Sequence, residues 1–198
     1  EISRGLELAG YKKCPGSVMA CNPLWCKSMK DWENQLGLWV GASTWESIRY
    51  LLIFSDARSI HGDSSLISSL KERAFDEVKR EQMLLRMLDN TMYLKKGIGV
   101  LGQLLVETHG AFSGSINLKE TAFFPFVNAA RLLAIYQGIK ETSTISRISL
   151  VSDSVMLHQD KSLYSKNFSA LLDYRLIHGN HRDYDSGHYV NTSKLNKV

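Results

Sequence analysis

Asp56 and Arg58 are the two residues whose types and spacing most directly suggest chemistry. They close the segment Phe54-Ser-Asp-Ala-Arg58, which follows the apolar run of residues 50–54. We interpret this run as a strand that continues to about Arg58, so that both side chains share one face. A carboxylate near the interior is costly unless it is paired, hydrogen-bonded or bound to metal. Two interpretations follow: a buried ion pair that closes the strand, or a carboxylate that binds metal or accepts a proton beside a cation suited to phosphate.

Lys119 and Arg131 are further candidates because both accompany a predicted helix. Thr121 caps this helix, and its apolar stripe runs over residues 123–134. Lys119 precedes the N-terminus, where aligned peptide dipoles attract anions, so it is either a ligand contact or a surface lysine at a loop end. Arg131 interrupts the apolar stripe and is either an ion-pair partner within a bundle or a second ligand contact.

The composition excludes several classes of protein. The chain has 198 residues, of which 44% are hydrophobic and 22% charged, and its net charge is +4. This is the balance of an ordinary globular protein, and it argues against a membrane span, a coiled-coil rod or a disulfide scaffold. The charge is too small and too evenly spread to indicate nucleic acid. We therefore expect neither a membrane nor a nucleic acid as partner. The spacing of serine, histidine and cysteine suggests no nucleophilic triad, and no glycine-rich phosphate loop occurs.

The elements that must position these candidates are mainly helical. Helical spacing of apolar residues covers about 28–41, 64–92, 121–134, 144–151 and 162–178, with a bend or break near Glu81 and Gln82. The fold class is therefore mainly α: a helix bundle preceded by a partial α/β segment with one or two strands, and with a short hairpin near 104–118. We divide the chain into 1–63 and 64–198 and expect the two parts to pack together.

Three stretches of the chain resemble a known family. Residues 14–25, Cys-Pro-Gly-Ser-Val-Met-Ala-Cys-Asn-Pro-Leu-Trp, resemble one motif of the bacterial, cytosolic putative nucleotidyltransferases, and residues 53–63 resemble a second. Ile116-Asn-Leu-Lys119, with the helix after it, resembles a third. This family is similar to the catalytic region of protein-PII uridylyltransferase and glutamine synthetase adenylyltransferase. The resemblance implies that residues 1–63 are the end of a nucleotidyltransferase catalytic domain and that 64–198 are a helical substrate-binding domain.

The resemblance also implies roles for the candidate residues. In this fold three strand-borne carboxylates surround Mg²⁺, and Asp56 matches the third, which would orient and deprotonate the attacking hydroxyl. Arg58 would brace Asp56 or meet a phosphate, and Lys119 and Arg131 would bind the nucleotide or the acceptor. Asn128 stands where the third motif of the family carries a carboxylate.

Departures from the family pattern limit what this chain is expected to do. The Gly-Ser loop and the first two carboxylates of the fold do not occur in these 198 residues. We therefore predict that the chain alone is inactive and that Asp56 holds Mg²⁺ only together with carboxylates upstream. In the intact parent, a cytoplasmic signal-transduction enzyme, the partners would be a nucleoside triphosphate and a regulatory protein. A homodimer is a further expectation. The alternatives are a non-catalytic protein-binding helical module of a nucleotide-sensing protein, and a purely structural helical domain.

Overall fold

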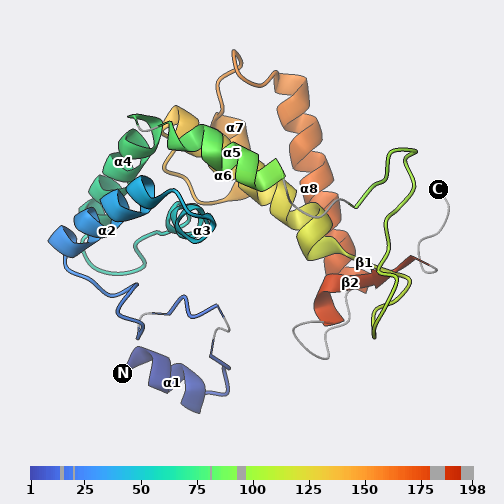
Figure 1. The fold of residues 1–198 in the computed structure, drawn as a ribbon, viewed down its shortest axis with the longest axis horizontal. Coiled ribbons are helices and arrows are strands. Elements are labelled where there is room, and N and C mark those ends of the chain that lie inside the picture. Colours follow the sequence, from blue (N-terminus) through green and yellow to red (C-terminus); the bar gives the residue numbers. More distant parts are fainter. Residues whose placement is uncertain (14–15, 20, 81, 93–96, 179–185, 193–198) are drawn as a thin grey trace.

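The computed structural model describes residues 1–13, 16–19, 21–80, 82–92, 97–178 and 186–192 (Figure 1). Helices dominate this part of the chain, as the apolar spacing predicts. The α-helices are α1 (Ile2–Leu8), α2 (Met29–Ala42), α3 (Trp45–Phe54), α4 (Ser64–Arg80), α5 (Met83–Met92), α6 (Phe124–Gln137), α7 (Thr144–Leu150) and α8 (His158–His178). A π-helical segment, η1 (Lys119–Phe123), runs directly into α6, and a 3₁₀ turn, η2 (Ser186–His188), precedes the last strand.

The helices α2 and α3 begin at capping residues that the sequence shows. The hydroxyl of Ser28 accepts a hydrogen bond from the backbone N–H of Asp31 at 3.2 Å. The hydroxyl of Thr44 accepts one from the N–H of Ser47 at 3.1 Å. Each bond satisfies an N–H group that has no partner inside the helix. The two caps fix where the first core helices start.

The strand predicted over residues 50–58 is wrong, because residues 50–54 are the last turns of α3. The buried side chains of Ile48, Leu51 and Leu52 recur at three and four residues and face the core together. A short apolar run fits a strand or a buried helix equally well. Here the cap at Thr44 and the absence of a helix breaker before Ser55 favour the helix. Asp56 therefore follows the end of a helix, not a strand.

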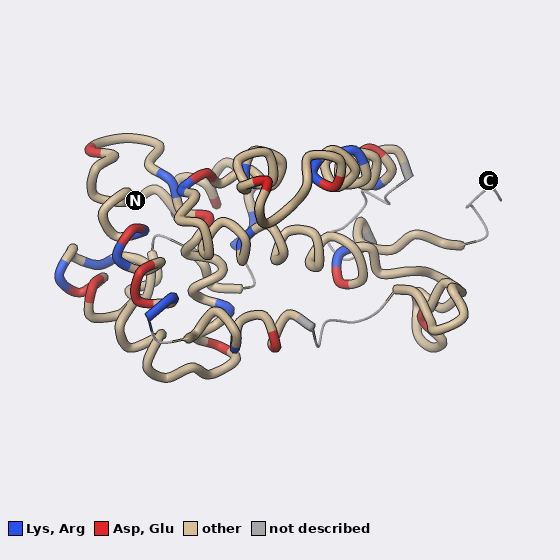
Figure 2. The backbone as a smooth tube through the Cα atoms, turned by 90° about the horizontal axis from the view of Figure 1, so that it is seen from above, with Lys and Arg blue, Asp and Glu red and all other residues tan. Residues whose placement is uncertain are grey.

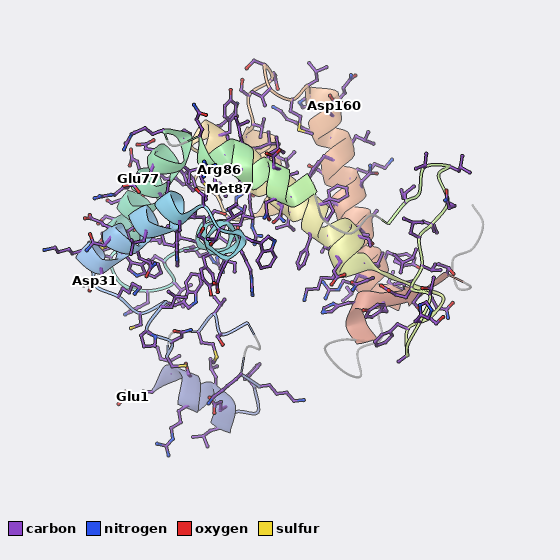
Figure 3. All side chains as sticks on the ribbon, viewed as in Figure 1. Glu1, Asp31, Glu77, Arg86, Met87 and Asp160 are labelled. Atoms are coloured by element: carbon purple, nitrogen blue, oxygen red, sulfur yellow. The ribbon has the colours of Figure 1, made fainter. Side chains whose placement is uncertain are left out.

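The break predicted near residues 81–82 is confirmed. Gln82 has a φ of 53°, a left-handed conformation that ends regular helix geometry between α4 and α5. The chain then turns so that Met83 and Met87 of α5 are fully buried in the core. Figure 3 labels Met87 on α5. Met87 thus packs in the same cluster as Leu51 of α3.

One apolar core joins the two parts of the chain. Its members come from α2, α3, α4 and α5 and include Leu132 and Ile135 of α6. The predicted packing of the first part of the chain against later helices is therefore confirmed for α2 and α3, whereas α1 has no buried residues. The long helix α8 lies beyond α6 and α7 and extends toward the small sheet (Figure 1).

The small sheet differs in part from the predicted hairpin near 104–118. Strand β1 (Ser115–Asn117) pairs antiparallel with β2 (Tyr189–Asn191), which follows it by more than seventy residues. The expected local contact also exists, since the N–H of Glu107 donates to the carbonyl of Ser115 at 2.8 Å. The buried side chains of Ile116 and Val190 face each other across the sheet. The sheet thus joins the segment before η1 to the end of the described chain.

Charges of both signs are interspersed along most helices, whereas residues 97–118 carry few (Figure 2). This agrees with the even distribution on which the sequence argument against nucleic acid depends. In the part of the chain that the structure describes, no helix has the length and apolar character that a membrane crossing requires.

Candidate functional site

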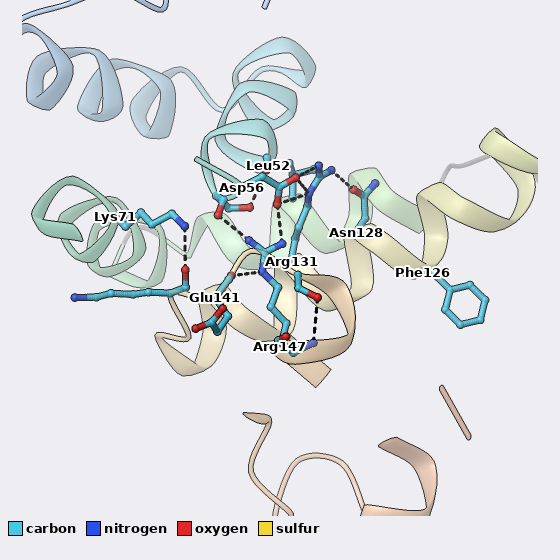
Figure 4. Close-up of polar contacts among 12 residues, drawn as sticks. Leu52, Asp56, Lys71, Phe126, Asn128, Arg131, Glu141 and Arg147 are labelled. Atoms are coloured by element: carbon cyan, nitrogen blue, oxygen red, sulfur yellow. Dashed lines mark hydrogen bonds and ion pairs between the residues drawn. The ribbon is translucent and has the colours of Figure 1, made fainter. Parts of the chain in front are cut away.

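The carboxylate of Asp56 lies at the centre of a cluster of charged side chains (Figure 4). Arg131 of α6 donates from Nε to Oδ1 at 3.2 Å and to Oδ2 at 3.0 Å, and its Nη2 also donates to Oδ2. Arg147 of α7 donates from Nη1 to Oδ1 at 2.7 Å. Both carboxylate oxygens therefore accept charge-assisted hydrogen bonds from two guanidinium groups, the strong class of such bonds.

Arg147 is positioned by backbone carbonyls as well as by Asp56. Its Nη2 donates to the carbonyl of Ser55 at 2.7 Å, and its Nε donates to the carbonyl of Glu141 at 2.6 Å. The side chain is only 1% exposed. Ser143 caps the short helix α7 and sets the turn on which Arg147 faces inward. A planar guanidinium can bridge three acceptors in this way, whereas a lysine could not reproduce the geometry.

Arg131 is held by one more contact, from Asn128 one turn earlier in α6. The side-chain oxygen of Asn128 accepts a hydrogen bond from Nη1 of Arg131 at 2.9 Å. The side chain of Asn128 is neutral, so this contact adds a hydrogen bond to Arg131 without a second negative charge. Asn128 is itself buried, and its side-chain oxygen points toward Arg131.

Two opposing effects set the pKa of Asp56. Burial raises it, but the hydrogen bonds and positive charges of Arg131 and then Arg147 outweigh burial and hold the pKa below its ordinary value. The carboxylate is therefore ionised at neutral pH. A carboxylate stabilised in this way is a weak base, because taking up a proton disrupts its ion pairs.

Lys71 of α4 adds a further buried cation next to this cluster. Its Nζ donates to the carbonyl of Lys140 at 3.0 Å, and the residue is 3% exposed. Burial, followed by repulsion from Arg147, lowers the pKa of Lys71 to about 8, although Asp56 partly opposes this shift. Three basic side chains thus surround one aspartate, and the cluster is net positive at neutral pH.

Arg58 does not take part in this cluster. The predicted pair between Asp56 and Arg58 is wrong, since Arg58 is exposed and the arginines that bind Asp56 are Arg131 and Arg147. A two-residue spacing places side chains on one face only in a strand, and Asp56 follows a helix instead. Arg131, by contrast, takes the ion-pair position within the bundle that was one of its two interpretations.

Lys119 lies elsewhere, about three turns before Arg131 along η1 and α6. Its Nζ is 3.4 Å from Nε2 of His188, whose Nδ1 is 3.1 Å from Nη2 of Arg175 in α8. Lys119 also lies over the ring of Phe124 at 5.7 Å. Basic side chains from η1, η2 and α8 therefore gather at this end of the molecule, which we call the Lys119 cluster: Lys119, Arg175 and His188.

The described residues do not by themselves suit Mg²⁺. Magnesium prefers several oxygen ligands in octahedral geometry, usually including carboxylates. Both oxygens of Asp56 face guanidinium groups, and no three His, Cys, Asp or Glu side chains of the described residues lie together as a metal would require. Binding of Mg²⁺ at Asp56 would require the carboxylate to leave at least one arginine.

Arg147 is the main site residue that the sequence did not reveal. It lies in a seven-residue helix whose apolar residues are too few to define a buried face. The two isoleucines near Arg147 could have indicated that this turn faces the core, and Ile148 is indeed buried. An arginine next to a buried position needs a polar partner.

The described residues form a mainly helical fold with a cluster of charged side chains around Asp56. Residues 81–198 match the family described as "Putative nucleotidyltransferase substrate binding domain", and residues 1–46 match "Putative nucleotidyltransferase". The first match spans more than half of the chain, so the chain belongs to this nucleotidyltransferase family. Asp56 lies between the two matched ranges, and its partners Arg131 and Arg147 lie in the substrate-binding one. No curated protein and no solved structure matched the chain.

Proposed function

We propose that this chain is part of a bacterial, cytoplasmic signal-transduction enzyme that transfers a nucleotidyl group from a nucleoside triphosphate to a regulatory protein. The model for this activity is protein-PII uridylyltransferase. The observation that carries the proposal is the match of residues 81–198 to a nucleotidyltransferase substrate-binding domain. In this proposal the helical bundle binds the acceptor protein, and it transfers nothing without the rest of the enzyme.

The Lys119 cluster is the proposed contact for the nucleotide or the acceptor. Lys119 and Arg175 are cations, and His188 lies between them. Cations from separate elements that converge at one place suit a phosphate or an acidic protein surface. The cluster also lies wholly inside the matched substrate-binding range.

Asp56 and Arg131 are better suited to positioning than to chemistry. Each oxygen of Asp56 is already hydrogen-bonded, and Arg131 directs its donors to Asp56 and Asn128. We therefore propose that this pair fixes α6 against the end of α3, and that Arg147 fixes α7 at the same point. The Mg²⁺ that the reaction requires would be held by carboxylates outside these residues, where it would stabilise the charge on the transferred phosphate.

The test uses the full-length protein that carries this sequence. It is incubated with Mg²⁺, each labelled nucleoside triphosphate in turn, and bacterial lysate or a purified PII-type protein. We expect label on one protein with one preferred nucleotide. Lys119→Gln should reduce kcat/KM at least tenfold, whereas the exposed Lys30→Gln on α2 should leave it unchanged.

Two outcomes would contradict the proposal. Absence of transfer with every nucleotide, by a folded protein that still binds a partner, would favour the non-catalytic binding module. Equal activity of Lys119→Gln and Lys30→Gln would remove the assignment of the Lys119 cluster. Asp56→Asn separates the two roles of that residue: loss of a general base lowers kcat by about 10²–10⁴-fold in a stable protein, whereas loss of positioning lowers kcat together with stability.

A further inference from the structure

A pocket beside Asp56 brings together the two sequence stretches that are most specific to the family. Its volume is about 310 Å³, and its lining includes Val18 and Trp25 from the first stretch and Ile53 and Asp56 from the second. Trp32 of α2 and Ile67 of α4 complete the walls. This size lies at the lower end of the range for small-molecule sites, which suits a ligand of one or two rings.

Aromatic rings make up much of the pocket wall. The rings of Trp25 and Trp32 are 6.1 Å apart at an angle of 53°, and that of Trp32 is 5.4 Å from the ring of Phe54. Both tryptophans are only half-buried, so part of each ring is open to a ligand. Flat rings such as nucleic-acid bases stack on aromatic surfaces of this kind.

Asp56 is the single charged group among the lining residues. Its side chain is 35% exposed, so the carboxylate can still be reached from the pocket. A carboxylate accepts hydrogen bonds only. Both oxygens already accept from Arg131 or Arg147, so an N–H group of a ligand would share one of these oxygens with a guanidinium. A ligand in this pocket should therefore combine flat apolar faces with an N–H group at one edge.

We propose that this pocket binds the base of a nucleoside, with the ring against Trp25 and Trp32 and an N–H edge group donating to Asp56. Amino groups of adenine and cytosine, and ring N–H groups of guanine and uracil, all meet this requirement. The inference rests on the proposed function, since it names the place where a nucleotide substrate would hold its base. It leaves the phosphates to other groups.

The test measures binding of free nucleosides, which lack phosphates, to the 198-residue chain by isothermal titration calorimetry and tryptophan fluorescence. We expect at least one of adenosine, cytidine, guanosine and uridine to bind and to quench fluorescence. Ile67→Trp fills the pocket and should weaken binding at least tenfold. Leu66→Trp, at an exposed neighbouring position of α4, should leave binding unchanged. Circular dichroism verifies that both variants are folded.

A second comparison tests the role of Asp56 without changing the protein. If adenosine binds, purine riboside, which lacks the exocyclic amino group, should bind about 10–100-fold more weakly, since a hydrogen bond to a charged group contributes about 1.5–3 kcal/mol. No nucleoside binding at millimolar concentration, or equal affinity of Ile67→Trp and Leu66→Trp, would overturn the pocket assignment. If the pocket assignment fails but the full-length protein transfers a nucleotidyl group, the proposed function still holds. If nucleosides bind but the full-length protein transfers nothing, the pocket assignment holds and the proposed function is contradicted.

Discussion

Arg147 and Asp56 form an ion pair across 91 residues of sequence, with Nη1 of the arginine 2.7 Å from Oδ1 of the aspartate. The same guanidinium also binds the carbonyl of Ser55, the residue that ends α3. One buried side chain therefore fixes α7 against the end of α3. Because Arg131 shares the carboxylate, α6 is fixed at the same point.

Arg147→Met should be strongly destabilising. The change leaves the buried carbonyl of Ser55 and the partly buried carbonyl of Glu141 without this donor, and one arginine as the partner of Asp56. Breaking a buried pair costs about 3–5 kcal/mol. Urea denaturation at pH 7 measures the free energy of unfolding. Arg58→Met, at an exposed arginine, should change it by less than about 0.5 kcal/mol. Equal effects of the two changes would contradict the structure.

Asp56→Asn should alter how stability depends on pH. The folded-state pKa of Asp56 is below its unfolded value, so its ionised form stabilises the fold above about pH 4. This contribution is lost as the pH falls through the folded-state pKa. We expect Asp56→Asn to cost about 1–3 kcal/mol at pH 7 and less as the pH falls below 4. The exposed Asp76→Asn is the control, and a constant difference from pH 7 to pH 3 would refute the prediction.

Lys71→Met should be stabilising at neutral pH. Folding lowers the pKa of Lys71 to about 8, so the folded state binds the proton of the ammonium group more weakly than the unfolded state does. The wild-type protein therefore gains stability as the pH rises from about 8 toward 10.5, where the penalty ends. We expect Lys71→Met to gain about 1–2 kcal/mol at pH 7 and to lose this advantage by pH 10. Denaturation at both pH values gives the free energy of unfolding of the variant and of the wild-type protein, with the exposed Lys30→Met as control. A stabilisation by Lys71→Met that increases with pH would contradict the prediction.

Tyr164→Phe should loosen the attachment of α8 to α6. The hydroxyl of Tyr164 donates to the carbonyl of Phe126, and its ring lies 4.8 Å from that of Phe126. Burial raises the pKa of Tyr164, so the hydroxyl stays protonated and available as a donor. Loss of this bond should cost about 1 kcal/mol, measured by thermal denaturation. Tyr136→Phe, at an exposed position of α6, should have no comparable effect.

The helical character of the chain could be predicted because caps and apolar spacing are local signals. Ser28 marks the start of α2, and the structure places its hydroxyl on the N–H group of Asp31. The order Ser43-Thr-Trp-Glu46 predicts a cap at Ser43, whereas the structure places the cap of α3 one residue later, at Thr44. The strand over residues 50–58 was mispredicted because a five-residue apolar run carries no period of its own. Reading it together with the cap at Thr44 would have continued the helix.

The candidate site was harder to predict because its bonds connect distant segments. Asp56 was identified from its position after an apolar run, and Arg131 from its interruption of a helix face. Their meeting depends on how α6 packs against α3, which neither local sequence encodes. Arg147 carried even less signal, since its burial follows from the path of the chain between α6 and α7.

The pairing of β1 with β2 has a consequence for synthesis of the protein. Residues 115–117 form their sheet pairing with residues 189–191, so this pairing forms late as the chain emerges from the ribosome. Contacts between residues so far apart in sequence also close slowly, because a long loop must first be ordered. A chain that stopped before Tyr189 would leave Ile116 without Val190 beside it. Loss of residues 189–191 would therefore disturb a segment more than seventy residues earlier in the sequence, next to Lys119.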